Sequence, residues 1–127
     1  MGVPRLSEKG HSARYWSELP ARIPGHYKIR TALGCGHVLQ VSGKNNGLRH
    51  RATLYHIGYD GQLRKIWSKA FRNEVPGADI AKLAALSAVQ EWAYDPIRQL
   101  ETGSNRTAKD IDALRLAVDA AIKEEKE

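Results

Sequence analysis

The stretch "RHRATLYHIGYDGQLRKIWSKAFR", residues 49–72, decides the fold, because it has the pattern of a β-hairpin. Asp60-Gly61 is a strong two-residue hairpin signal, and placing it in the turn pairs Tyr59 with Gln62. Neither face of this hairpin is apolar throughout, whereas a purely structural hairpin usually has one dry side. The predicted faces carry Arg51, Thr53, Tyr55, Arg64 and Ser68 on one side, and His50, Leu54, His56, Lys65, Trp67, Lys69 and Phe71 on the other.

The residues before the hairpin predict two more strands. Residues 27–33 alternate between apolar and polar side chains, residues 34–36 form a glycine-rich turn, and residues 37–42 have the composition of a returning strand. Residues 43–47 are rich in Gly and Asn and predict a loop. Residues 12–19 predict a short helix that ends before Pro20. The sheet is therefore expected to have about four antiparallel strands.

The residues after the hairpin predict two helices. An Ala-rich helix is expected over residues 79–94, with Asp79 as a possible N-cap and its end before Pro96. An amphipathic helix is expected over residues 107–125. The prediction is one α+β domain, residues 12–127, in which the sheet packs on the Ala-rich helix. The C-terminal helix covers that helix in a monomer, or contacts a second copy in a homodimer. Residues 1–11 are expected to form a flexible basic arm.

The charge is concentrated in one part of the chain. The net charge of the 127 residues is +6, but residues 27–72 contain nine lysines and arginines and a single acid, Asp60. Residues 73–127 contain seven positive and eleven negative side chains. Charge separated in this way favours association with polyanions.

The cations alternate with aromatic residues, which is typical of surfaces that bind phosphates and stack on bases. The sequence therefore predicts a non-enzymatic nucleic-acid-binding protein that uses a basic sheet surface, with Trp67 or Tyr55 as a stacking platform. The alternative is that the aromatic residues belong to the core and lysine stems pass over them. The predicted binding residues are Lys28, Arg30, Lys44, Arg49, Arg51, Tyr55, His56, Arg64, Lys65, Trp67 and Lys69.

Two kinds of chemistry are weaker alternatives. A metal-dependent nuclease needs several carboxylates around its ions, and the basic segment has only one. A metal-independent ribonuclease would use His50, His56, Lys65 and Tyr55. Cys35 and His37, together with His50 and His56, are ligand types that zinc accepts, but the second Cys pair of a zinc ribbon is missing. We therefore expect no catalytic residue, no metal and no cofactor.

The cellular setting follows from what the sequence lacks. No apolar run is long enough to span a membrane, and residues 1–20 contain no apolar block typical of a signal peptide. The single cysteine is compatible with a reducing compartment. We expect a cytoplasmic protein without a membrane partner.

The predicted order of elements resembles three groups of proteins. A short helix, antiparallel strands and an Ala-rich helix resemble the double-stranded-RNA-binding domain, and residues 27–93 resemble the arm-binding domains of phage integrases. Both resemblances imply contact with DNA or RNA. Strand hairpins followed by an Ala-rich helix are also similar to small phage anti-defence proteins, including some anti-CRISPRs. This resemblance implies the alternative function, a phage or mobile-element inhibitor that binds a host nucleoprotein complex.

Overall fold

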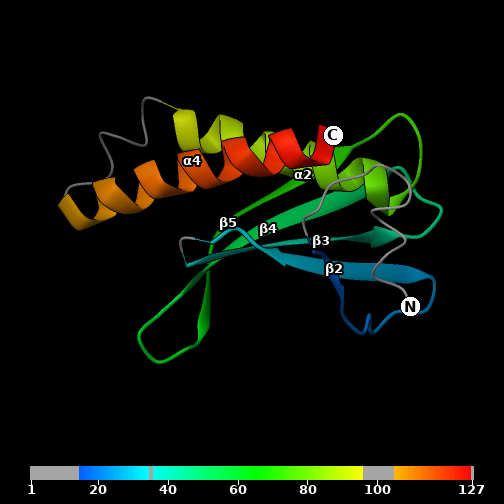
Figure 1. Ribbon diagram of the computed structural model, residues 1–127. Coiled ribbons are helices and arrows are strands. Elements are labelled where there is room, and N and C mark those ends of the chain that lie inside the picture. The colour runs from blue at the N-terminus through cyan, green and yellow to red at the C-terminus, as the bar shows by residue number, and fades with distance from the viewer. Residues whose placement is uncertain (1–14, 35, 96–104, 127) are drawn as a thin grey trace.

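The computed structural model describes residues 15–34, 36–95 and 105–126, which form an antiparallel sheet with two helices on one side (Figure 1). The strands lie in chain order, β1-β2-β3-β4-β5. Their bounds are Ser17–Glu18, His26–Ala32, His37–Lys44, Arg49–Ile57 and Leu63–Arg72, and the helices are α2, Ala78–Tyr94, and α4, Asn105–Lys126. The predicted α+β class is confirmed, with five strands in place of about four. The predicted arm, residues 1–11, lies outside the described residues.

The additional strand is β1, in the segment where the sequence predicted a helix. Ser17 and Glu18 pair with Arg30 and Ile29 of β2, so the helix prediction for residues 12–19 is wrong in its described part. Trp16 is buried in the core, and its indole Nε1 donates a hydrogen bond to Glu125 of α4 at 2.9 Å. An extended backbone lets the segment pair with β2 and at the same time bury the Trp16 indole. These tertiary contacts override the local preference for a helix.

The β4–β5 hairpin follows the predicted register up to Leu54, which pairs with Trp67. From Tyr55 onward the register shifts by one residue, so that Tyr55 pairs with Lys65 and Ile66 is the extra residue of β5. The connection spans residues 58–62, and Asp60 accepts bonds from the Gln62 backbone N–H at 3.0 Å and from Arg64 at 2.9 Å. The two-residue turn prediction is therefore wrong, and the longer loop accounts for the bulge.

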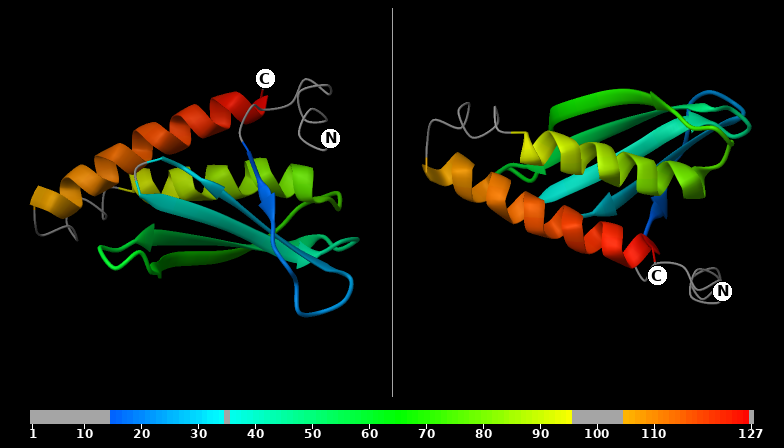
Figure 2. Two further views of the ribbon diagram at one scale, coloured as in Figure 1. Left: turned by 60° about the horizontal axis from the view of Figure 1, so that its bottom comes forward. Right: turned by 90° about the horizontal axis from the view of Figure 1, so that it is seen from above.

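The two helices form a single layer over the sheet and run antiparallel to each other (Figure 2). Ala81, Ala85 and Ala93 of α2 are fully buried, and these small side chains allow the helix to approach β3 and β4 closely. The α4 helix lies alongside α2, where Arg115 Nε donates a hydrogen bond to the Ala93 carbonyl at 2.7 Å. The N-cap of α2 is Gly77, and Asp79 instead lies in the first turn.

The core lies between the helical layer and one face of the sheet. Its largest fully buried side chains include Leu39, Leu54, Leu86 and Leu114, which come from both layers. Within the described residues, no helix has the length and apolar character needed to cross a membrane.

Candidate functional site

The two faces of the sheet differ in chemistry because successive side chains of a strand point to opposite sides. Leu39, Val41, Ala52 and Leu54 face the helices and are completely buried. Neither of the two described helices lies against the other side (Figure 2, left), and we call it the open face. By strand register, the open face comprises His26, Lys28, Arg30, Ala32, Val38, Gln40, Ser42, Lys44, Arg49, Arg51, Thr53, Tyr55, Ile57, Leu63, Lys65, Ser68, Ala70 and Arg72.

Seven cations lie on the open face, and the strands that carry them contribute no acid. These cations are Lys28, Arg30, Lys44, Arg49, Arg51, Lys65 and Arg72. Strands β2 to β5 contain neither Asp nor Glu. Within the described part of the chain, none of the seven forms an ion pair, whereas Arg64, Lys82 and Arg115 each do. The positive charge of the open face is therefore not compensated by nearby described carboxylates.

Neutral partners hold two of the guanidinium groups in place. Arg30 Nε donates a hydrogen bond to Gln40 Oε1 at 2.8 Å, and its guanidinium carbon lies 5.2 Å from the centre of the Tyr55 ring. Arg51 donates a hydrogen bond to Ser68 Oγ at 2.9 Å. Uncharged partners orient these groups and leave their charge free to act on an anion.

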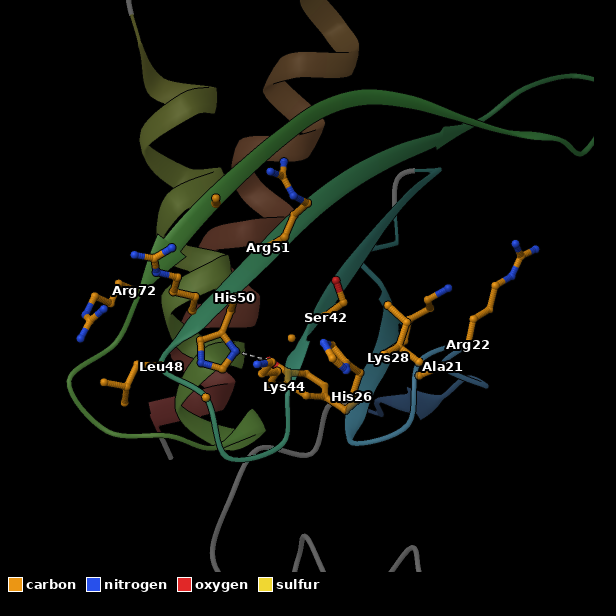
Figure 3. Close-up of a pocket in the computed structure, with 16 residues that line it drawn as sticks. Ala21, Arg22, His26, Lys28, Ser42, Lys44, Leu48, His50, Arg51 and Arg72 are labelled. Atoms are coloured by element: carbon orange, nitrogen blue, oxygen red, sulfur yellow. Dashed lines mark hydrogen bonds between the residues drawn. The ribbon is translucent and has the colours of Figure 1, made fainter.

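One end of the open face is hollowed. The hollow has a volume of about 710 Å³ and lies between the loop that joins β1 to β2 and the ends of the following strands (Figure 3). Among the described residues that line it are six lysines and arginines and no Asp or Glu. Its lining consists of Ala21, Arg22, Ile23, His26, Tyr27, Lys28, Ser42, Gly43, Lys44, Gly47, Leu48, Arg49, His50, Arg51, Ala70 and Arg72.

A buried polar pair supports the hollow from the helix side of the sheet. The Tyr27 hydroxyl and His50 Nδ1 are 2.6 Å apart, and His50 is only 3% exposed. Desolvation by burial raises the pKa of Tyr27 to about 12 and lowers the pKa of His50. Both side chains are therefore neutral near pH 7. A Cβ atom at Gly43 would lie 2.8 Å from His50 Nδ1, so glycine is needed for this close approach.

The structure brings together seven of the predicted binding residues on the open face. They are Lys28, Arg30, Lys44, Arg49, Arg51, Tyr55 and Lys65. The bulge at Ile66 moves Lys65 to this face, away from the face predicted from the unshifted register.

The remaining predicted residues lie elsewhere. His56 packs edge-on against His37, with ring centres 4.8 Å apart. Trp67 is half-buried on the helix side, where its ring centre lies 5.9 Å from that of Trp92, and Lys69 shares that side. Arg64 is paired with Asp60 at the hairpin tip.

Sequence reasoning missed the part of the site that comes from the loop before β2. Arg22, Ile23 and His26 line the hollow, and only the folded chain shows that this loop lies beside the ends of β3 and β4. Arg72 was also missed, although the predicted register already placed it opposite Arg49.

The candidate ribonuclease residues do not converge. His50 and His56 lie six residues apart on β4, a separation of about 20 Å in an extended strand. Cys35 lies outside the described residues, and within the described ones no group of three or more His, Cys, Asp or Glu side chains is arranged to hold a metal ion.

Comparison with known proteins gives no independent assignment: the chain matches no protein-family model, no curated protein and no solved structure.

Proposed function

We propose that the protein is a small, non-enzymatic nucleic-acid-binding protein that uses the open face of its sheet and acts in the cytoplasm. One observation carries this proposal. Seven cations share a sheet face that no helix covers, and none of them is paired with a described carboxylate. Regularly spaced phosphates are the common biological ligand for an extended cationic surface.

The distribution of acids supports the same proposal. Helices α2 and α4 together contain seven acidic and six basic residues. The helical layer is therefore close to neutral, whereas the open face is strongly positive. This separation would orient the open face toward a polyanion during approach.

The proposal also accounts for the polar groups between the cations. Ser42 and Ser68 lie between the cations of the open face and are partly exposed, whereas Gln40 and Thr53 beside them are buried. Hydroxyl groups commonly bind phosphate and sugar oxygens alongside Lys and Arg. These contacts read the backbone of the nucleic acid and supply affinity without base specificity.

The test is a binding measurement by fluorescence anisotropy with labelled DNA and RNA oligonucleotides at about 50 mM salt. We expect binding in the micromolar range or tighter that weakens steeply as salt is added. Absence of binding at low salt to single-stranded and duplex probes would exclude the proposal.

A host nucleoprotein complex is the alternative partner that the sequence suggested, and a capture experiment separates the two. The tagged protein is incubated with host lysate that has or has not been treated with nuclease. Partners lost on nuclease treatment are expected if nucleic acid is the ligand. A defined protein complex that is retained after nuclease, together with no binding to free oligonucleotides, would favour the inhibitor function.

A further inference from the structure

We propose that the hollow at the end of the open face binds an unpaired nucleotide, so that the protein prefers single strands to duplexes. The base would lie against the apolar part of the lining, and its phosphates would contact the surrounding cations. This inference rests on the proposed function and specifies its ligand.

The concave shape of the hollow favours a ligand that can enter it. Contacts to phosphates alone need cations on a surface and do not require a cavity. The hollow, however, has a volume of about 710 Å³, which is within the range of sites that enclose small ligands. A duplex is too wide to enter such a hollow, and its bases are already stacked and paired. An unpaired nucleotide has a free base that can enter.

The lining of the hollow combines apolar and cationic side chains. Apolar side chains are supplied by Ala21, Ile23, Leu48 and Ala70. Figure 3 shows Leu48 on the side of Arg72 and Ala21 on the opposite side beside Arg22, so apolar and cationic side chains lie next to each other around the hollow. A lining of this kind matches a ligand that has a flat apolar face and negative charges at its edge. A nucleotide has this combination.

The β1–β2 loop, which forms one wall of the hollow, is held in position by backbone hydrogen bonds. The backbone N–H of Leu19 donates to the Lys28 carbonyl at 2.8 Å, and that of Asn45 donates to the Gly25 carbonyl at 2.8 Å. These bonds attach one end of the β1–β2 loop to β2 and the other end to the turn that follows β3. Ile23 in this loop is nevertheless 60% exposed, although its side chain is large and apolar. A fixed, exposed isoleucine that lines a hollow is well placed to contact the base of a ligand.

The experiment compares two exposed isoleucines. Ile23→Ser removes the apolar wall of the hollow, and Ile66→Ser is the matched control because Ile66 is 42% exposed and lies outside the hollow. The probes are fluorescein-labelled oligothymidylate of about 12 nucleotides and a blunt-ended DNA duplex of about 12 base pairs, measured at the same salt. Circular dichroism melting curves verify that both variants are folded.

We expect the unmodified protein to bind oligothymidylate at least about tenfold more tightly than the duplex. Ile23→Ser should weaken oligothymidylate binding by about fivefold, because an apolar contact with the base is lost. It should leave duplex binding within about twofold, and Ile66→Ser should change neither affinity.

The outcomes that overturn the inference are distinct from the failure of the proposed function. Equal affinity for the two probes, or equal effects of Ile23→Ser and Ile66→Ser, would overturn the inference while nucleic-acid binding stands. Absence of binding to both probes would exclude the proposed function and the inference with it.

Discussion

Removal of two cations from the open face should weaken the salt dependence of nucleic-acid binding by an amount that can be calculated. Arg51 and Arg72 are exposed, both line the hollow, and neither pairs with a described carboxylate. The double variant Arg51→Gln/Arg72→Gln removes their charge and keeps a polar side chain at each position. We expect it to fold normally, since within the described residues the substitutions remove one side-chain hydrogen bond, from Arg51 to Ser68 Oγ.

The magnitude follows from the number of cations on the open face. If all seven contact phosphates of a single strand, log K plotted against log salt concentration should have a slope of about −5. Removing two cations should reduce the slope to about −3.5. Between about 50 and 200 mM salt, the unmodified protein should lose about 1000-fold in affinity and the variant about 100-fold.

The assay is fluorescence anisotropy of a labelled oligothymidylate at four or more salt concentrations. The matched control is Lys123→Gln/Lys126→Gln, which changes the net charge equally but lies in the last turn of α4, in the helical layer. The control should keep the slope of the unmodified protein, because its cations lie away from the open face.

Two results would refute this reasoning. If the control variant lowers the slope as much as Arg51→Gln/Arg72→Gln does, total charge and not the open face governs binding. If the unmodified protein has a slope shallower than about −2, fewer than three cations meet phosphates and the surface does not act as a unit.

Two further predictions concern the buried support of the hollow. Gly43→Ala should lower the free energy of unfolding by about 1–3 kcal/mol, because its Cβ would lie 2.8 Å from both the Arg49 carbonyl oxygen and His50 Nδ1. Urea denaturation measures this loss, and an equally small effect of Gly43→Ala and Ser42→Ala would contradict the predicted clash. Burial lowers the pKa of His50 below its ordinary value of 6.5, so the folded state binds fewer protons than the unfolded state. The free energy of unfolding should therefore fall as the pH drops below about 6.5, by at most about 1.4 kcal/mol per pH unit. His50→Gln should reduce the difference in unfolding free energy between about pH 7.5 and pH 5, and an unchanged difference would show that other groups cause it.

The class and order of the elements could be predicted because they depend on local patterns. The period of two in residues 27–33 and 49–57 corresponds to β2 and β4, and the Ala-rich segment corresponds to α2 almost to the residue. Leu54 pairs with Trp67 as the two-residue turn predicted, but only because the extra residue Ile66 offsets the one-residue shift made by the longer loop.

The details of the site were less predictable because they depend on contacts between distant residues. The longer loop at residues 58–62 and the extra residue Ile66 shift the register, and this shift decides on which face Lys65 lies. Nothing local in residues 12–19 indicates that Trp16 is held by Glu125, a residue more than one hundred positions later. The hollow depends in the same way on the β1–β2 loop meeting the ends of later strands.

Strand β5 is an edge of the sheet, and its composition has a consequence for behaviour at high concentration. Long exposed edges invite a second copy to add its own edge and start aggregation. Here Arg64, Lys65, Lys69 and Arg72 would face the same charges on an antiparallel copy, and the bulge at Ile66 interrupts the straight row of backbone groups. Several copies crowded along one polyanion would therefore remain separate molecules and would not fuse into a continuous fibre.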